Sequence, residues 1–99
     1  MKIAEVTQMI EAVAPLGLQE GWDNCGLQVG DPDGEATGAL LCLDVTEAIL
    51  DEAIAKGLNL IITHHPLIFR GLKSITGRTH IERIVMRAIK NGIAIYSAH

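Results

Sequence analysis

The spacing of apolar residues predicts the first structural segments of the chain. Between residues 3 and 13 the apolar residues recur at every third or fourth position, which predicts an amphipathic helix that ends before Pro15 and Gly17. Residues 15–38 contain six glycines and two prolines, so we expect mostly loop there. Within this stretch, residues 27–29 alternate briefly between apolar and polar, as a short strand does.

Three apolar runs follow, at residues 39–43, 58–63 and 93–96, and the second of them contains Asn59 and Thr63. A short run of this kind is typical of a strand that is covered on both faces, as the strands of parallel sheets are. We therefore expect three buried strands in this part of the chain.

Two helices are predicted between these strands. Thr46 is placed to cap the first helix, and Gly57 suits its end. Thr79 and Glu82 fit a capping box at the start of the second helix, and Gly92 suits its end. The order strand, helix, strand, helix, strand predicts βαβ units with right-handed crossovers. The expected fold is therefore α/β, with a parallel-containing sheet and flanking helices.

The length of 99 residues predicts one domain over residues 1–99, and the composition predicts how it packs. Hydrophobic residues make up 48% of the chain but only three residues are aromatic, so the core must be aliphatic. The apolar surplus fits either a dense small core or a surface that another chain covers, and we favour the covered surface.

The cysteines and the longest apolar runs bear on the cellular location. The two cysteines have no CxxC spacing, which favours a reducing cytoplasm without disulfides. No apolar run approaches the roughly 18 residues that cross a bilayer, and the N-terminus lacks the pattern of a signal peptide. We expect a cytoplasmic protein with no membrane partner.

Charge is unevenly distributed along the chain. Residues 1–55 contain eleven acidic residues and one basic residue, whereas residues 56–99 contain seven basic residues and one acidic residue. This asymmetry fits either a phosphate-binding half or two halves that pack together and offset each other, and we favour the second interpretation. A basic domain with stacking aromatic residues is missing, which argues against a nucleic-acid partner.

Candidate metal ligands stand just beyond the predicted strands. Asp44 follows the first run, His64 and His65 follow the second, and His99 follows the third. If the strands are parallel, all four side chains meet at one edge of the sheet. Imidazole is a common ligand for zinc, iron, nickel and copper. The alternative is that one histidine binds a metal or substrate while the other only bonds to nearby backbone.

The two adjacent histidines indicate a site for two ions. Neighbouring residues in an extended chain point to opposite faces, so His64 and His65 are not placed to chelate one ion together. They are placed to bind one ion each, as two-metal hydrolytic sites require.

Two loop segments add weaker candidates. The only tryptophan, Trp22, precedes Asp23 and Asn24, and these polar side chains would reach the metal edge unless they only form a tight turn. Arg70 and Lys73 follow the histidines and are candidate contacts for a substrate phosphate, with a solvated loop as the alternative.

Four segments carry a resemblance to a known family. They read GWDNCGL at residues 21–27, LDVT at 43–46, IITHHPLIF at 61–69 and YSAH at 96–99. In this order they resemble the Ngg1-interacting-factor-three-like family, whose bacterial members are often labelled GTP cyclohydrolase 1 type 2 homologues. The resemblance spans nearly the whole chain.

The resemblance implies a dinuclear metal protein with an α/β fold, assembled as a toroidal hexamer around an inner cavity. It implies that His64 and His65 are ligands, one to each divalent ion, and that further motif residues line the same pocket: Asp44, Trp22, Asp23, Asn24 and His99. Zinc, iron, manganese, nickel and magnesium are not distinguished by these residues. The family's remaining ligands belong to longer chains, so we expect this chain to be the N-terminal part of such a protein.

Three hypotheses for function follow. The first is a metal-dependent hydrolase that acts on a small nucleotide-like substrate, as the family label suggests. The second is a protein that stores, senses or delivers metal, or that serves as a scaffold. The third is that the piece on its own is an inert truncated fragment.

Overall fold

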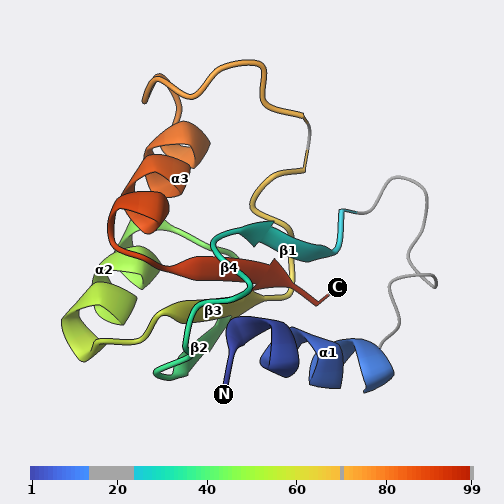
Figure 1. Ribbon diagram of the computed structural model, residues 1–99. Helices are drawn as coiled ribbons and strands as arrows, with labels where there is room; N and C mark the ends of the chain where they lie inside the picture. Colours follow the sequence, from blue (N-terminus) through green and yellow to red (C-terminus); the bar gives the residue numbers. More distant parts are fainter. Residues whose placement is uncertain (14–23, 70, 99) are drawn as a thin grey trace.

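A computed structural model describes residues 1–13, 24–69 and 71–98. Three helices and four strands follow one another along the chain (Figure 1), in the order α1 (Ile3–Val13), β1 (Gly26–Val29), β2 (Ala39–Cys42), α2 (Glu47–Lys56), β3 (Leu60–Thr63), α3 (His80–Lys90) and β4 (Ala94–Ser97). Each predicted helix and strand is present, with strand ends that differ from the predicted ones by one or two residues. The predicted end of the first helix at Pro15 and Gly17 lies outside the described residues.

The four strands form one mixed sheet in the order β1-β4-β3-β2. β2, β3 and β4 are parallel, so the prediction of a parallel-containing sheet is confirmed. In this register Cys42 pairs with Thr63, and Thr63 pairs with Ser97. β1 runs antiparallel to β4, with Gly26 opposite Ser97, and this direction was not predicted.

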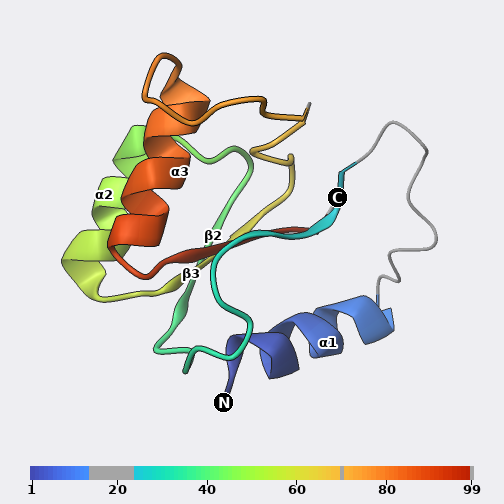
Figure 2. The ribbon, with the colours of Figure 1, turned by 45° about the horizontal axis from the view of Figure 1, so that its top comes forward.

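The helices cover both faces of the sheet (Figures 1 and 2). α2 and α3 lie on one face, where Ile61 and Ile95 join a buried cluster with Leu50 and Ile84. α1 lies on the other face, where Ile3 packs in a second cluster with Leu60, Ala94 and Tyr96. Alternate residues of β3 and β4 thus enter opposite clusters, as the alternation of side chains along a strand requires. The core is mainly aliphatic, as predicted.

Both predicted N-caps are present. The Thr46 hydroxyl accepts a hydrogen bond from the amide of Ile49 at 3.2 Å, and the Thr79 hydroxyl accepts one from the amide of Glu82 at 3.2 Å. The Glu82 carboxylate accepts a bond from the amide of Thr76 at 2.9 Å, so it also holds the loop before the helix.

Helix ends also follow the sequence. Gly57 ends α2 with a φ of 69°, in the left-handed region that glycine adopts easily. Gly92, with a φ of 66°, follows Asn91 at the end of α3. Within the described ranges, no helix is long and apolar enough to cross a membrane.

The oppositely charged halves of the chain meet at the surface between α2 and α3. Arg83 lies 3.7 Å from a carboxylate oxygen of Glu47, and Arg87 lies 3.8 Å from the other oxygen of that group. Arg87 also pairs with Asp51. These contacts confirm the interpretation that the two halves pack together and offset part of each other's charge.

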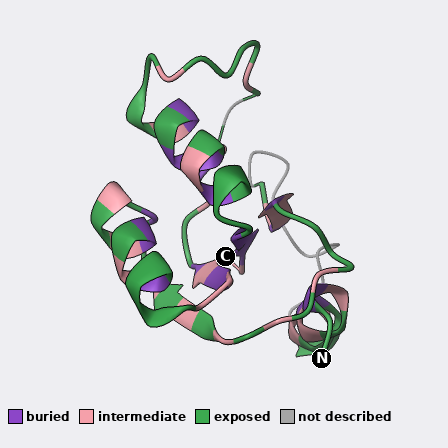
Figure 3. Ribbon diagram, turned by 60° about the vertical axis from the view of Figure 1, so that its left-hand side comes forward, coloured by how far each residue is buried: buried purple, intermediate pink, exposed green. Residues whose placement is uncertain are grey.

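Apolar side chains remain exposed at the edge strand β2. Leu40 and Cys42 pack against the cluster beneath α2 and α3, so Leu41 and Leu43 face the other side, where they are 72% and 68% exposed. Figure 3 shows buried residues concentrated where the helices meet the sheet. The covering of this surface by another chain stays a prediction.

Candidate metal-binding site

The carboxyl ends of the parallel strands bring predicted site residues together. Asp44 follows the end of β2, and His64 and His65 follow the end of β3. Asp44 Oδ1 and His65 Nδ1 are 2.9 Å apart, which is hydrogen-bond distance. Both side chains are exposed, His65 by 50% and Asp44 by 67%. Three residues predicted to line the same pocket, Trp22, Asp23 and His99, lie outside the described residues.

The backbone of the histidine pair is held by the end of β2. The amide of His64 donates to the carbonyl of Cys42 at 3.0 Å, and the amide of His65 donates to the carbonyl of Leu43 at 2.9 Å. Backbone hydrogen bonds between the two segments therefore continue beyond the ends of β2 and β3. These two bonds fix the backbone positions that carry the two imidazole side chains.

A buried hydroxyl group reinforces this arrangement. Thr63 is fully buried, and its Oγ1 lies 2.9 Å from the carbonyl oxygens of both Leu43 and His65. On the other side, the Ser97 hydroxyl donates to the carbonyl of His64 at 3.5 Å, a long contact. The turn that carries the histidines is thus connected to both neighbouring strands.

The two imidazole rings lie beside each other. The ring centroids of His64 and His65 are 4.8 Å apart, with an angle of 56° between the planes. The prediction that the rings point to opposite faces was wrong, because the chain bends at both residues and no longer alternates as an extended strand does.

These residues fit part of a divalent-metal site. Two imidazoles are suitable metal donors. Metal-binding histidines commonly have one ring nitrogen hydrogen-bonded to a carboxylate, as His65 has to Asp44. A neutral imidazole whose Nδ1 donates to a carboxylate carries its lone pair on Nε2, the atom that would then bind a metal ion. However, across residues 1–13, 24–69 and 71–98, no three or more His, Cys, Asp or Glu side chains are grouped so that they could hold a metal ion. A complete centre therefore requires donors from elsewhere.

Asn24 reaches the same edge of the sheet through the antiparallel β1. The start of β1 lies beside the end of β4, and the Asn24 amide donates to the carbonyl of Ile68 at 2.5 Å. Gln28 accepts a bond from the amide of Ile68 at 3.0 Å. The side chains of Asn24 and Gln28 thus hold the segment after the histidines against β1. Gln28 was not predicted, although a polar residue inside a short apolar strand was a usable signal.

A hollow of about 560 Å³ opens beside Asp44. It lies between the start of α2, the segment after the histidines and the start of α3, and it is lined by Asp44, Val45, Thr46, Glu47, Pro66, Leu67, Phe69, His80 and Ile81. Phe69 is 51% exposed and offers an aromatic face at its wall. Lys73 is exposed and does not line the hollow, and Arg70 lies outside the described residues. Phosphate contact by these two residues stays a prediction.

The surroundings of the nearby Cys42 raise the pKa of its thiol. Burial raises the pKa of Cys42, and the carboxylate of Asp44 raises it further, whereas a hydrogen bond with Thr63 lowers it. Since the thiolate is the form that ligates metals, this environment disfavours Cys42 as a ligand. Cys42 is thus placed to act as a small apolar residue of the strand.

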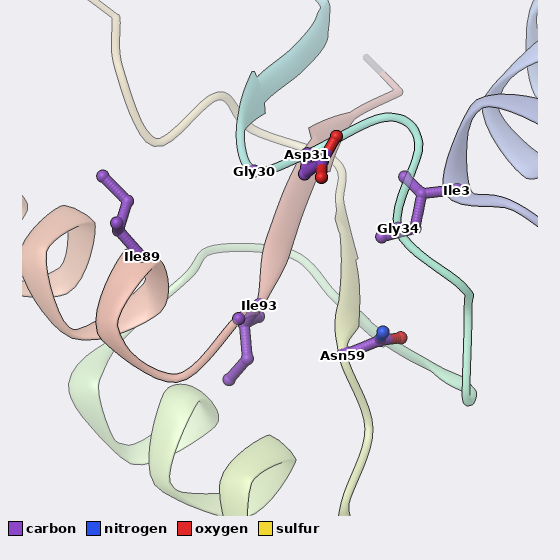
Figure 4. A pocket seen from close by; sticks show the side chains of 8 residues that line it. Ile3, Gly30, Asp31, Gly34, Asn59, Ile89 and Ile93 are labelled. Atoms are coloured by element: carbon purple, nitrogen blue, oxygen red, sulfur yellow. The ribbon is translucent and has the colours of Figure 1, made fainter.

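A second hollow, of about 410 Å³, lies at the opposite edge of the sheet (Figure 4). Asn59 and Ile93 line it just before β3 and β4, and Gly30 lines it just after β1. The Asn59 side chain accepts from the amide of Thr37 at 2.8 Å and donates to the carbonyl of Glu35 at 2.6 Å. Asn59 therefore holds the loop before β2, and none of the predicted site residues that the structure describes lines this hollow.

The fold and the site define an α/β protein with paired histidines at the carboxyl edge of its parallel strands. A family model described as Duf34/NIF3 (NGG1p interacting factor 3) matches residues 1–99, so the chain belongs to this family. The resemblance drawn from the sequence motifs is thereby confirmed.

Relatives and solved structures agree with this assignment. Over its full length, the chain is 48% identical in sequence to a Clostridium perfringens protein named GTP cyclohydrolase 1 type 2 homolog. The match covers 38% of that protein. A Staphylococcus aureus crystal structure matches the whole chain at 41% identity and a TM-score of 0.95, with 28% of that protein covered. HcgD from Methanocaldococcus jannaschii matches at 36% identity and a TM-score of 0.90, with 40% covered. The chain thus spans less than half the length of these proteins.

Proposed function

We propose that this chain supplies two imidazole ligands, His64 and His65, to a centre for divalent metal ions. The contact between Asp44 and His65 carries the proposal, because a carboxylate on Nδ1 orients the ring and increases the basicity of Nε2. Further donors would come from residues outside the described ranges or from the longer chain that family members have.

We further propose two ions in the intact protein, one on each histidine. Ring centroids 4.8 Å apart are compatible with ions roughly 3.5–4 Å apart, the spacing of two-metal hydrolytic sites. When bound, such ions supply Lewis acidity and lower the pKa of a water molecule. The role of this chain is to hold the two imidazoles side by side and to fix the orientation of His65 through Asp44.

The activity we propose for the whole protein is metal-dependent hydrolysis of a nucleotide-like substrate. The hollow beside Asp44 is the candidate substrate site, with Phe69 available for contact with a base ring. The name of the Clostridium perfringens relative, GTP cyclohydrolase 1 type 2 homolog, supports a purine nucleotide. Arg70 and Lys73 remain candidate phosphate contacts because they follow the histidines in the sequence.

The alternative is a protein that stores or delivers metal, with the oligomer as its scaffold. The exposure of His65 and Asp44 favours this alternative, since accessible donors exchange ions readily and hydrolytic centres usually exclude bulk water. A homo-oligomer in the cytoplasm, a hexamer by family resemblance, would also cover exposed residues such as Leu41 and Leu43.

Metal analysis tests the ligands directly. We expect purified protein to contain divalent metal, and His64→Ala and His65→Ala each to lose at least half of it. Lys90→Ala is the control, because Lys90 is an exposed residue in the last turn of α3 that does not line the hollow beside Asp44. Unchanged metal content in both test variants would remove the ligand assignment. A nucleotide-hydrolysis screen on a full-length relative, with the same two substitutions, then separates the hydrolase from the carrier.

A further inference from the structure

Thr63 connects the end of β2 to the turn that carries the histidines. Its hydroxyl oxygen lies 2.9 Å from the carbonyl oxygen of Leu43 and 2.9 Å from that of His65, and the residue is fully buried. A hydroxyl has one proton to donate, so the two carbonyl groups share it. A single buried group thus links two segments that are distant in sequence.

We propose that Thr63 is a positioning residue whose hydroxyl fixes the backbone of His65 and, through it, the imidazole beside Asp44. The effect of Thr63 on metal binding rests on the proposed function. The effect on the backbone of His65 does not, and it can be measured without metal.

The hydrogen bonds explain why the hydroxyl matters more than the shape of the side chain. The amide of His65 already donates to the carbonyl of Leu43 at 2.9 Å, so the Thr63 hydroxyl closes a small ring of contacts around His65. Without the Thr63 hydroxyl, the carbonyl of Leu43 would keep the His65 amide as its donor, but the carbonyl of His65 would lose this one, and the turn would shift to find another. Such a shift would move the His65 ring relative to Asp44.

The same contacts predict that the effect is local to His65. The carbonyl of His64 contacts a different hydroxyl, that of Ser97, at the longer distance of 3.5 Å. The amide of His64 bonds to the carbonyl of Cys42, whereas the hydrogen bond between Thr63 and Cys42 involves the Cys42 thiol. Loss of the Thr63 hydroxyl should therefore disturb His65 before it disturbs His64.

Three variants of the 99-residue chain separate positioning from general stability. Thr63→Val keeps the branched shape and removes the hydroxyl, whereas Thr63→Ser keeps the hydroxyl. Thr7→Val is the matched control, because Thr7 is also buried and its hydroxyl donates to the carbonyl of Ala4 at 3.0 Å in α1, away from the histidines. Melting temperatures show which variants remain folded.

Amide hydrogen exchange measures the position of the backbone. In Thr63→Val we expect the His65 amide to exchange at least tenfold faster relative to the other amides of the sheet. Thr63→Ser and Thr7→Val should leave this ratio unchanged. An unchanged ratio in Thr63→Val, or an equal change in Thr7→Val, would overturn the proposal.

Titration with Zn²⁺ alone measures the consequence for the site. Loss of groups that orient metal ligands typically costs 10–100-fold in affinity, and we expect a loss in this range for Thr63→Val, with affinity restored in Thr63→Ser. If the wild-type chain binds Zn²⁺ and Thr63→Val binds it equally well, the role of Thr63 at the site is wrong. If neither the wild-type chain nor any variant binds Zn²⁺, the proposed function fails, and hydrogen exchange still decides whether Thr63 positions His65.

Discussion

Asp44 and His65 are 21 residues apart in the sequence, yet Asp44 Oδ1 lies 2.9 Å from His65 Nδ1. The register of the parallel strands accounts for this contact. Cys42 pairs with Thr63, and Asp44 and His65 each lie two residues beyond these partners. The contact is therefore a direct consequence of how β2 and β3 align, and a shift of one residue in that register would break it.

Replacement of Asp44 tests what this contact contributes. In Asp44→Asn we expect Zn²⁺ affinity to fall roughly 10–100-fold, because the amide orients and polarises the His65 ring less well than the carboxylate does. Titration calorimetry measures the loss, and ¹⁵N chemical shifts of the His65 ring report its tautomer.

The matched control for this prediction is Asp33→Asn, because Asp33 is an exposed aspartate in the turn after β1. Equal affinities for wild type, Asp44→Asn and Asp33→Asn would show that the carboxylate beside His65 has no role in binding.

Much of the fold could be predicted because local signals agree with the tertiary structure. The caps at Thr46 and Thr79 depend only on neighbouring residues, and the apolar runs are long enough to show that both faces of their strands are covered. The site followed from the same reasoning, since parallel strands gather the residues after their carboxyl ends at one edge. Asp44 and His65 illustrate this.

The rest depended on geometry that no short pattern contains. The direction of the four-residue β1 is set by its pairing with β4, so the contacts of Asn24 and Gln28 with Ile68 could not be read from the sequence. The closeness of the two rings depends on bends at His64 and His65, which the apolar run before them does not reveal. Long-range pairing, rather than local preference, decided these features.

The cap of α2 allows a prediction for stability. Thr46→Ala should lower the free energy of unfolding by about 1 kcal/mol, because it removes the acceptor for the amide of Ile49. Thr46→Ser keeps that acceptor and should remain close to wild type. Urea denaturation measures both values, and equal losses in the two variants would show that the hydroxyl does not cap the helix.

Gly30 allows a sharper prediction, because the backbone of β4 approaches it closely. A Cβ atom at this position would lie 2.6 Å from Cα and Cβ of Ala94, and the φ of Gly30 is +112°. Gly30→Ala should therefore cost about 2 kcal/mol or more, from overpacking and backbone strain together.

Two glycines serve as controls for this substitution. Gly57 has a φ of +69° but open space around its Cβ position, so Gly57→Ala should cost only about 1 kcal/mol, from strain alone. Gly71 also has open space and no positive φ, so Gly71→Ala should be nearly neutral. Thermal or urea unfolding gives the order of the three variants, and a Gly30→Ala protein as stable as Gly71→Ala would contradict the close approach of the strands.

Glu82 makes stability depend on pH. Its carboxylate accepts bonds from the amides of Thr76 and Arg78 and from the hydroxyls of Thr79 and Thr76, and the amide of Thr76 contributes most to holding the pKa below the ordinary value of 4.5. A lowered pKa in the folded state means that the charged form is stabilised by folding. This contribution is fully present above the ordinary pKa and is lost as the pH falls through the lower, folded-state pKa.

Substitution of Glu82 should therefore change how stability against urea depends on pH in the acid range. We expect Glu82→Gln to unfold at a lower urea concentration than wild type at pH 7, and the difference to shrink as the pH is lowered below 4.5, the ordinary value for this group. Glu52→Gln is the control, because Glu52 is an exposed residue of α2 that pairs with Lys56 at 3.2 Å. Urea midpoints measured from pH 7 down to pH 3 test this. The difference between Glu82→Gln and wild type could instead stay constant across this pH range. That result would show that the charge of Glu82 does not stabilise the loop and the start of α3.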